Sequence, residues 1–168
     1  VWSVPKGFEP LTSISIVVAA RNESENISDC LNALNGLEYP KELLEIFIVN
    51  DHSEDDTASV VQSISDDIAG LTLLNLPAGL EGKKNAINYG VNKASGKLIV
   101  STDADCIVNK DWLLNLSSFY QYNNYKFIAA PVLFHKEKTI FEKFQSLDFM
   151  GMMAVSAAGI RGGFMNMC

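Results

Sequence analysis

Apolar residues recur along the chain at two spacings, and their alternation predicts the order of the secondary-structure elements. Short continuous runs rich in β-branched side chains, such as ISIVVAA at 14–20, are typical of strands that are covered on both faces. Between these runs, apolar residues recur every three or four positions, as they do in helices. The predicted strands cover residues 14–20, 44–50, 71–76, 97–103 and 127–134, and a helix is predicted after each of the first four, the third of them over 84–94.

Polar and turn-forming residues mark the ends of several of these elements. Asn22 stands three residues before Glu25, which is the spacing of a capping box, and Gly36 follows the last apolar position of the first helix. The run SEDD at 53–56 offers a start for the second helix. Pro131 lies inside the last predicted strand and favours an edge position or a bend there.

Strands that alternate with helices predict an α/β fold, with a mostly parallel sheet and helices on both of its faces. In such sheets, ligands bind beyond the carboxyl ends of the strands. Three of the predicted strands end in polar residues, in the segments ARNE at 20–23, NDHSEDDT at 50–57 and TDADC at 102–106. We therefore expect these three segments to lie along one rim and to form a binding crevice.

The composition is that of an ordinary globular domain. The 168 residues are 48% hydrophobic, so we expect one folded domain over 1–168. A net charge of -7 argues against a general nucleic-acid surface, which needs a basic face. Three cysteines without CxxC spacing fit neither a disulfide framework nor a zinc site, and a reducing cytoplasmic location is expected.

Nothing in the sequence is long and apolar enough to predict a membrane span. The segment FMGMMAVSAAGI at 149–160 is too short, and we expect a buried or amphipathic helix there. The chain begins with Val1 and stops at Cys168 without a polar finish, so we expect it to be part of a longer protein, truncated at the C-terminus.

Asp103 and Asp105 are the first candidates for chemistry at the expected rim. Two carboxylates this close repel each other unless a cation lies between them, and Mg²⁺ or Mn²⁺ prefers such oxygen ligands. The alternative is a solvated turn without metal. Asp51, at the end of the second strand, either accepts hydrogen bonds from a nucleoside or serves only as a turn residue.

Arg21, Glu23 and Lys83 are weaker candidates at the same rim. Glu23 could frame a ligand or only favour the start of a helix. Lys83 and Lys84 follow Gly82 at a probable helix start, where a phosphate would be favoured, although two solvated lysines are the simpler alternative. Neither a P-loop nor GxGxxG is present, which makes a nicotinamide-binding fold improbable.

Taken in order, these segments resemble family 2 of the inverting glycosyltransferases, whose donor-binding domain has the fold known as GT-A. The resemblance covers residues 12–150 and rests on four motifs, with a weaker fifth, FEKFQSLDF. The motifs are SIVVAARNESENISDCLNAL, FIVNDHSEDDT, GKKNAINYG and LIVSTDADC.

The resemblance implies a role for each matching residue. The nucleotide-binding set is Ala19, Arg21, Glu23, Asp51, Lys83 and Asp103, and the metal-binding DxD pair is Asp103 and Asp105. Within these sets, Asp51 contacts the base or ribose, and the DxD pair holds the diphosphate of the donor through Mg²⁺ or Mn²⁺. In two places the sequence departs from the family pattern, with Ala19 where proline is usual and His52 where glycine is usual.

The implied reaction displaces a nucleoside diphosphate from the anomeric carbon of a sugar by an acceptor hydroxyl, with inversion. A UDP-sugar is the expected donor, and a saccharide or a lipid-linked molecule is the expected acceptor. The general base of the family comes well after the DxD motif, so we expect it beyond Cys168, and Asp148 is a poor match for it. In the full-length protein, the resemblance implies polysaccharide synthesis at the cytoplasmic face of the inner membrane, with membrane contact outside this chain.

Three alternatives remain at this point. A phosphatase of the haloacid dehalogenase type also uses DxD after an apolar strand, but there the motif opens the domain and the residue two places after the second Asp is Thr or Val, where this chain has Ile107. Sugar nucleotidylyltransferases need a glycine-rich segment after the first strand, and AARNES does not supply it. The third alternative is a chain that binds nucleotide and metal but catalyses nothing.

Overall fold

A computed structural model describes residues 3–123, 125–130, 132 and 139–162 of the chain. The side chains at 156, 157 and 160–162 are not described. The chain forms two compact units, Val1–Lys126 and Phe127–Cys168.

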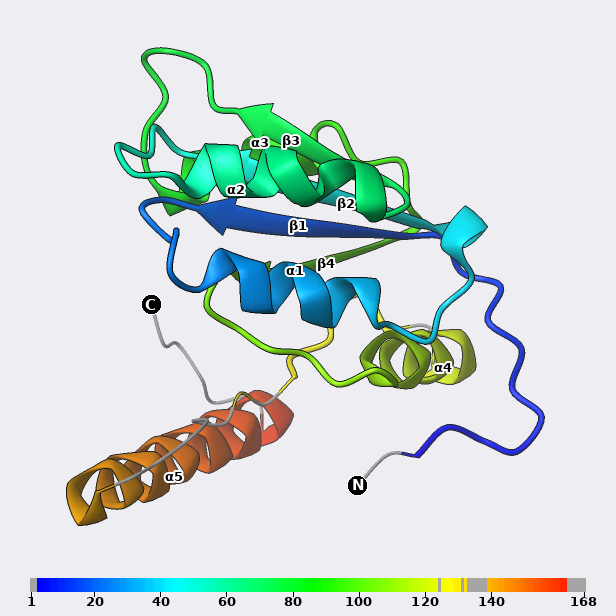
Figure 1. The fold of residues 1–168 in the computed structure, drawn as a ribbon. Helices are drawn as coiled ribbons and strands as arrows, with labels where there is room; N and C mark the ends of the chain where they lie inside the picture. The colour runs from blue at the N-terminus through cyan, green and yellow to red at the C-terminus, as the bar shows by residue number, and fades with distance from the viewer. Residues whose placement is uncertain (1–2, 124, 131, 133–138, 163–168) are drawn as a thin grey trace. The chain divides into compact units, whose positions relative to one another are not determined.

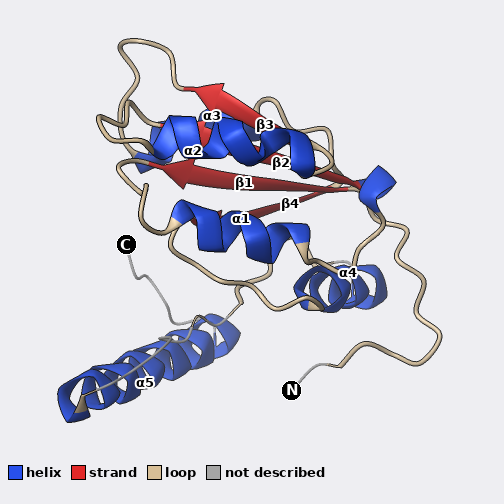
Figure 2. Ribbon diagram, in the orientation of Figure 1, coloured by secondary structure: helices blue, strands red, loops and turns tan. Residues whose placement is uncertain are grey.

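A four-stranded parallel sheet forms the centre of the first unit (Figures 1 and 2). Its strands are β1 Ile14–Ala20, β2 Leu44–Asn50, β3 Leu71–Asn75 and β4 Leu98–Asp103. Their order in the sheet is β3-β2-β1-β4. The chain adds β2 and β3 on one side of β1 and then crosses to place β4 on the other side, so the strand order reverses at β1. Four of the five predicted strands are confirmed, each within one residue at its ends.

Helices follow each strand, as the α/β pattern predicts. They are α1 Ile27–Asn35, α2 Thr57–Ile64, α3 Lys83–Val91 and α4 Trp112–Asn123, with short 3₁₀ turns at Lys41–Leu43 and Ser65–Asp67. The third helix begins one residue before the predicted position and ends three residues earlier. Gly36 caps the end of α1, as expected.

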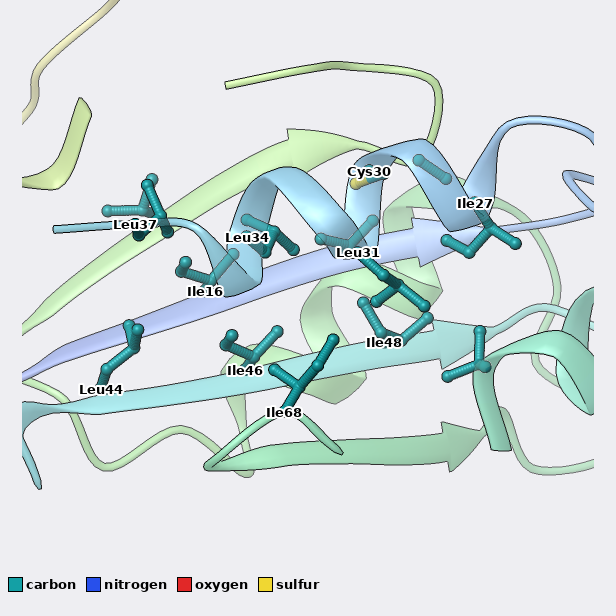
Figure 3. Packing of buried hydrophobic residues seen from close by; sticks show 14 of the residues in the cluster. Ile16, Ile27, Cys30, Leu31, Leu34, Leu37, Leu44, Ile46, Ile48 and Ile68 are labelled. Atoms are coloured by element: carbon teal, nitrogen blue, oxygen red, sulfur yellow. The ribbon is translucent and has the colours of Figure 1, made fainter. Parts of the chain in front are cut away.

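Alternating residues of β1 divide the core into two layers. Ile14, Ile16 and Val18 point to one face, where they pack with side chains of α1, α2 and α4. Figure 3 shows this packing, with Leu31 and Leu34 of α1 over the strands. Val17 points to the opposite face and packs with Phe47, Val49, Leu76 and Ala86, the last of these from α3. The sheet is thus covered on both faces, as the continuous apolar runs predicted.

Gly90 lets α3 lie close to the sheet. A Cβ atom at this position would be 2.5 Å from Cγ1 of Val17 and 3.1 Å from Cγ2 of Val49. Any larger residue would therefore push α3 away from β1 and β2. The N-terminus of the same helix carries Lys83, so this packing also fixes the end of the helix that faces the strand ends.

The capping-box prediction at Asn22 and Glu25 is wrong. Helix α1 begins at Ile27, with Asn26 at the capping position. Asn22 instead adopts a left-handed backbone with φ of 55°, and its side-chain oxygen accepts a hydrogen bond from the Glu54 N–H at 2.8 Å. Asn tolerates this conformation better than most residues, and its short polar side chain can bond to a nearby backbone group. Asn22 therefore joins two loops rather than starting a helix.

The second unit contains α5, Ile140–Gly162. The helix predicted at 149–160 as buried or amphipathic is confirmed as a helix within α5, and the side chains of Met150, Met152 and Val155 in this segment are exposed. No helix in the described part of the chain combines the length and apolar character that a membrane crossing requires.

The predicted fifth strand is wrong where it can be compared. Residues 127–130 and residue 132 are not in a strand, and residues 131, 133 and 134 lie outside the described residues. An apolar run forms a strand only if a neighbouring strand pairs with it, and a proline at 131 supplies no N–H for such pairing.

Candidate functional site

The polar ends of three strands meet at one edge of the sheet. Ala20 of β1 is paired with Asn50 of β2, and Ala19 is paired with Asp103 of β4. The backbone N–H of Asp51 donates to the Ala20 carbonyl at 2.9 Å, which extends the pairing beyond β2. The rim expected from the sequence is therefore present, and it lies where the strand order reverses.

A cavity of about 280 Å³ opens at this rim. Its lining residues are Ala19, Ala20, Arg21, Glu23, Asp51, Gly82, Lys83, Asp103, Ala104 and Asp105. All seven residues that the resemblance singled out are among them. They come from four separate segments of the sequence, which the parallel sheet brings to one place.

Asp51 is the most buried carboxylate of the cavity, with only 4% of its side chain exposed. Its Oδ2 accepts a hydrogen bond from the Gly82 N–H at 2.9 Å and lies 3.8 Å from Nη1 of Arg21. Its Oδ1 lies 3.2 Å from Nδ1 of His52. The hydrogen bond from Gly82 and the neighbouring Arg21 and His52 side chains thus fix the orientation of this carboxylate, which a buried charge requires.

Gly82 is a residue of the site that the sequence analysis did not assign. Its φ of 87° lies in the left-handed region, which glycine adopts without strain. This conformation aims the Gly82 N–H at Asp51 and starts α3 at Lys83, so the carboxylate and the lysine are positioned by the same turn. The GK pair in the sequence was the signal, but nothing in it indicated the partner of the glycine.

His52 has an unusual backbone for its residue type. Its φ is 53°, which is again the left-handed region. The resemblance expects glycine at this position, and the backbone explains why, since glycine reaches this region freely. In this chain the imidazole lies beside Asp51 at the price of some strain.

Asp103 and Asp105 flank a buried residue at the end of β4. Ala104 is only 3% exposed, whereas both neighbouring carboxylates are exposed. Oδ1 of Asp103 lies 2.6 Å from Nζ of Lys83. Within the described residues, the Asp105 carboxylate makes no hydrogen bond or ion pair. The turn therefore buries its alanine and presents two carboxylates to the cavity.

Two cysteines donate hydrogen bonds to the backbone of this turn. The Asp103 carbonyl accepts hydrogen bonds from the Cys106 N–H at 3.2 Å and from Sγ of Cys30 at 3.8 Å. Burial raises the pKa of Cys30 to about 12, so it remains a thiol that can donate. Cys30 and Cys106 are both free, and Cys168 lies outside the described residues. The thiol of Cys30 and the backbone of Cys106 therefore support the DxD turn, and the two cysteines do not form a disulfide with each other.

The donor set suits a hard divalent cation. Asp103 and Asp105 offer carboxylate oxygens, which Mg²⁺ and Mn²⁺ prefer, and Mg²⁺ commonly uses one or two carboxylates with water and substrate phosphates. In the described part of the chain, no group of three or more His, Cys, Asp and Glu side chains is placed to hold a metal.

Four hydrogen bonds join the loop after β1 to the loop after β2. The donors in the first loop are the backbone N–H groups of Asn22, Glu23 and Ser24, which bond to Ser53, Thr57 and Asp55, and the Glu54 N–H donates back to Asn22. We call this set the loop clamp. Hydrogen bonds from Thr57 and Ser24 hold the pKa of Asp55 well below its ordinary value, so Asp55 stays an acceptor at neutral pH. The clamp fixes the loops that carry Arg21, Glu23 and Asp51.

A larger hollow, of about 460 Å³, lies between α1 and the segment after the DxD turn. Its charged residues are Asp29 and Lys110, and Lys110 is already paired with Glu38 at 2.7 Å. It lies away from the strand ends and gathers few polar groups, so size alone does not identify the site.

Comparison with known proteins gives one family. The sequence profile described as Glycosyl transferase family 2 matches residues 15–158. The glycosyltransferase AglE of Haloferax volcanii is 32% identical over 103 residues, which is 61% of this chain and 34% of that protein. The poly-beta-1,6-N-acetyl-D-glucosamine synthase of Staphylococcus aureus is 29% identical over 151 residues, which is 86% of this chain and 34% of that protein. The chain thus spans about a third of the length of these curated relatives.

Solved structures show the same fold. A mannosyltransferase, PcManGT from Pyrobaculum calidifontis, in complex with GDP-Man and Mn²⁺, matches with a TM-score of 0.62 and 28% identity, over 71% of this chain and 35% of that one. Residues 1–349 of TarS from S. aureus, in complex with UDP-GlcNAc, match with a TM-score of 0.62 and 23% identity, over 74% of this chain and 38% of that one.

Proposed function

Because the chain belongs to glycosyl transferase family 2, we propose that its first unit binds a nucleotide-diphosphate sugar, as the donor-binding part of a longer enzyme that transfers the sugar to an acceptor hydroxyl. The observation that carries the proposal is the cavity at the strand ends, because one hollow collects all seven residues that the family motifs assign to donor and metal. Family membership sets aside the phosphatase and the nucleotidylyltransferase.

The nucleoside is proposed to lie against Asp51. A carboxylate has about four lone-pair positions, so donors from Gly82 and His52 leave capacity for a ribose or base donor. Asp51 is already oriented by these contacts and needs no rearrangement to accept another hydrogen bond. Arg21 and Glu23 line the same cavity from the neighbouring loop and would frame the nucleotide.

The diphosphate is proposed to lie between Lys83 and the DxD pair. Lys83 is the first residue of α3, and a helix N-terminus combines a partial positive charge with N–H groups that lack partners within the helix. Asp103 and Asp105 would hold Mg²⁺ or Mn²⁺, which supplies Lewis-acid stabilisation of the departing diphosphate. The Mn²⁺ in the mannosyltransferase complex supports a divalent metal.

The transfer step also needs a base for the acceptor hydroxyl, and inversion follows if the acceptor attacks from the face opposite the leaving group. We propose that this base lies beyond Cys168. Asp148 is an exposed residue of α5 in the second unit. A chain that binds the donor without transferring sugar is therefore the second candidate function for these 168 residues.

The remaining parts of the proposal follow from the family resemblance. The donor is expected to be a UDP-sugar, although the mannosyltransferase relative binds GDP-Man, so both nucleotides need to be tested. The acceptor is proposed to be a saccharide or a lipid-linked molecule. The full-length enzyme is proposed to act at the cytoplasmic face of the membrane, with membrane contacts outside this chain.

Calorimetry with UDP and with GDP, each with and without Mn²⁺, tests donor binding. We expect one nucleotide to bind and its affinity to depend on Mn²⁺. Sugar transfer to an acceptor, rather than release of nucleotide, is then compared between this chain and the full-length protein. The chain is expected to be slower by at least about 10²-fold, since a general base alone contributes about 10² to 10⁴. Equal transfer rates would move the base into these 168 residues, with Asp148 as the first candidate.

A further inference from the structure

The ion pair between Lys83 and Asp103 joins a predicted phosphate ligand to a predicted metal ligand. Nζ of Lys83 lies 2.6 Å from Oδ1 of Asp103, which is a short distance for an ion pair. The lysine is the first residue of α3 and the aspartate is the last residue of β4, and both line the cavity. A single contact thus uses one group from each half of the proposed diphosphate site.

This pair is suited to open. The two side chains are 62% and 52% exposed, and exposed ion pairs contribute little net stability because water competes for both charges. The lysine stem is flexible and its ammonium is a compact charge, so it can leave without moving the helix. The helix itself is held by Gly90 against Val17 and by the bond from Gly82 to Asp51.

Lys83 and a divalent cation compete for the carboxylate of Asp103. The ammonium, 2.6 Å from Oδ1, occupies one of the lone-pair positions that a metal would use, and two cations on one carboxylate repel each other. Displacement leaves the ammonium within the same cavity, next to the position proposed for a doubly charged diphosphate.

We propose that Lys83 is a placeholder cation for the DxD pair. It neutralises Asp103 before the donor arrives, yields Oδ1 to the divalent cation, and then pairs with the diphosphate. This rests on the proposed function, because it requires metal and donor in this cavity. The placeholder role predicts that Lys83 lowers the affinity for the metal alone and raises the affinity for the nucleotide.

The test measures two affinities in Lys83→Met and in Lys84→Met. Lys84 is the next residue of α3, is also exposed, and is not among the residues that line the cavity. Its removal therefore reports the general loss of positive charge near the rim. Binding of Mn²⁺ alone is followed by the electron paramagnetic resonance of free Mn²⁺, and binding of UDP and GDP at saturating Mn²⁺ by calorimetry. Thermal melting checks that both variants are folded.

The two affinities are expected to move in opposite directions. Lys83→Met should bind Mn²⁺ alone about 2- to 5-fold more tightly than Lys84→Met, the range of an exposed ion pair. It should bind the nucleoside diphosphate about 10-fold more weakly, as expected for a lost charge-assisted hydrogen bond. Equal or weaker Mn²⁺ binding than in Lys84→Met overturns the placeholder role, as does unchanged nucleotide affinity.

Failure of the proposed function would have a different signature. In that case the wild-type chain would bind neither nucleotide, or would bind one equally with and without Mn²⁺, and Asp105→Asn would change nothing. The placeholder role would fall with it. If the wild type shows metal-dependent binding and only the Lys83→Met comparison fails, the donor site stands and the placeholder role alone is overturned.

Discussion

Carboxylates lie at both ends of the strands, along the amino-terminal edge and the carboxyl-terminal edge of the sheet, and their partners differ. At the amino-terminal edge, Glu45 of β2 accepts hydrogen bonds from the Ser95 and Gly96 N–H groups and from the Ser15 and Ser95 hydroxyls. At the carboxyl-terminal edge, Asp103 is paired with the long side chain of Lys83, and in the described part of the chain Asp105 has no such pairing.

The kind of donor explains the difference in role. Backbone N–H groups cannot swing away as a long side chain can, and the fully buried Ser15 is fixed in β1, so together these donors hold Glu45 in place. Partial burial alone would raise the pKa of Glu45, but the hydrogen bonds from Ser15, Ser95 and Gly96 outweigh it and lower the pKa. An exposed lysine can exchange its partner for a ligand. The contacts at the amino-terminal ends of the strands thus hold the strands together, whereas the carboxyl-terminal ends are where we propose that the donor binds.

The largest expected effect is on the binding edge. Asp103→Asn should weaken Mn²⁺-dependent binding of the nucleoside diphosphate by about 10- to 100-fold, because even an outer-shell partner of a metal is worth that much. Calorimetry with and without Mn²⁺ measures it. Glu45→Gln is the control from the opposite edge and should leave this affinity unchanged. If both variants weaken binding equally, the two edges do not differ in role.

Asp51 should separate the nucleoside from the diphosphate. Asp51→Ala removes a buried charged acceptor, so the affinity ratio of nucleoside diphosphate to pyrophosphate should fall by about 10-fold. Both affinities are measured by calorimetry at saturating Mn²⁺. Loss of Asp51 also removes the partner of the Gly82 N–H and could shift Lys83, which would weaken both ligands through their phosphates. Taking the ratio of the two affinities cancels this shared effect. A ratio equal to that of the wild type would refute a base or ribose contact.

Glu45→Gln should act on stability instead. We expect a loss of about 1 kcal/mol in the free energy of unfolding, since charge-assisted hydrogen bonds become neutral ones. Because folding lowers the pKa of Glu45, its contribution is present above the ordinary glutamate pKa of about 4.3 and is lost as the pH falls through the lowered pKa. Urea unfolding at several pH values measures this. The wild type should lose more stability on acidification than the variant, and parallel pH profiles would contradict the role.

The loop clamp should give the smallest effect. Asp55→Asn replaces one acceptor oxygen by an amide and should weaken nucleotide binding by about 2- to 3-fold, through the position of Arg21 and Glu23. Asp56→Asn is the matched control, since Asp56 is exposed and its side chain makes no capping hydrogen bond. Calorimetry on both compares them. Similar losses in the two variants would point to net charge rather than to the clamp.

The sequence by itself determined the frame of this protein. Continuous apolar runs predicted five strands, of which four form the parallel sheet, and the polar segments after three of these predicted the rim. These predictions succeeded because strand and helix periodicity is local, and because parallel strands bring their carboxyl ends to one edge wherever they occur in the sequence. The family motifs added the identity of seven of the ten residues that line the cavity.

The tertiary structure decided which side chains meet. Asn22 joins the loop after β2 rather than capping α1, Gly82 donates to Asp51 across 31 positions of the sequence, and Lys83 pairs with Asp103. Such contacts depend on left-handed turns and on the packing that brings distant loops together. A local pattern carries the preference of a residue for a conformation, but the partner that satisfies its polar atoms is supplied only by the folded chain.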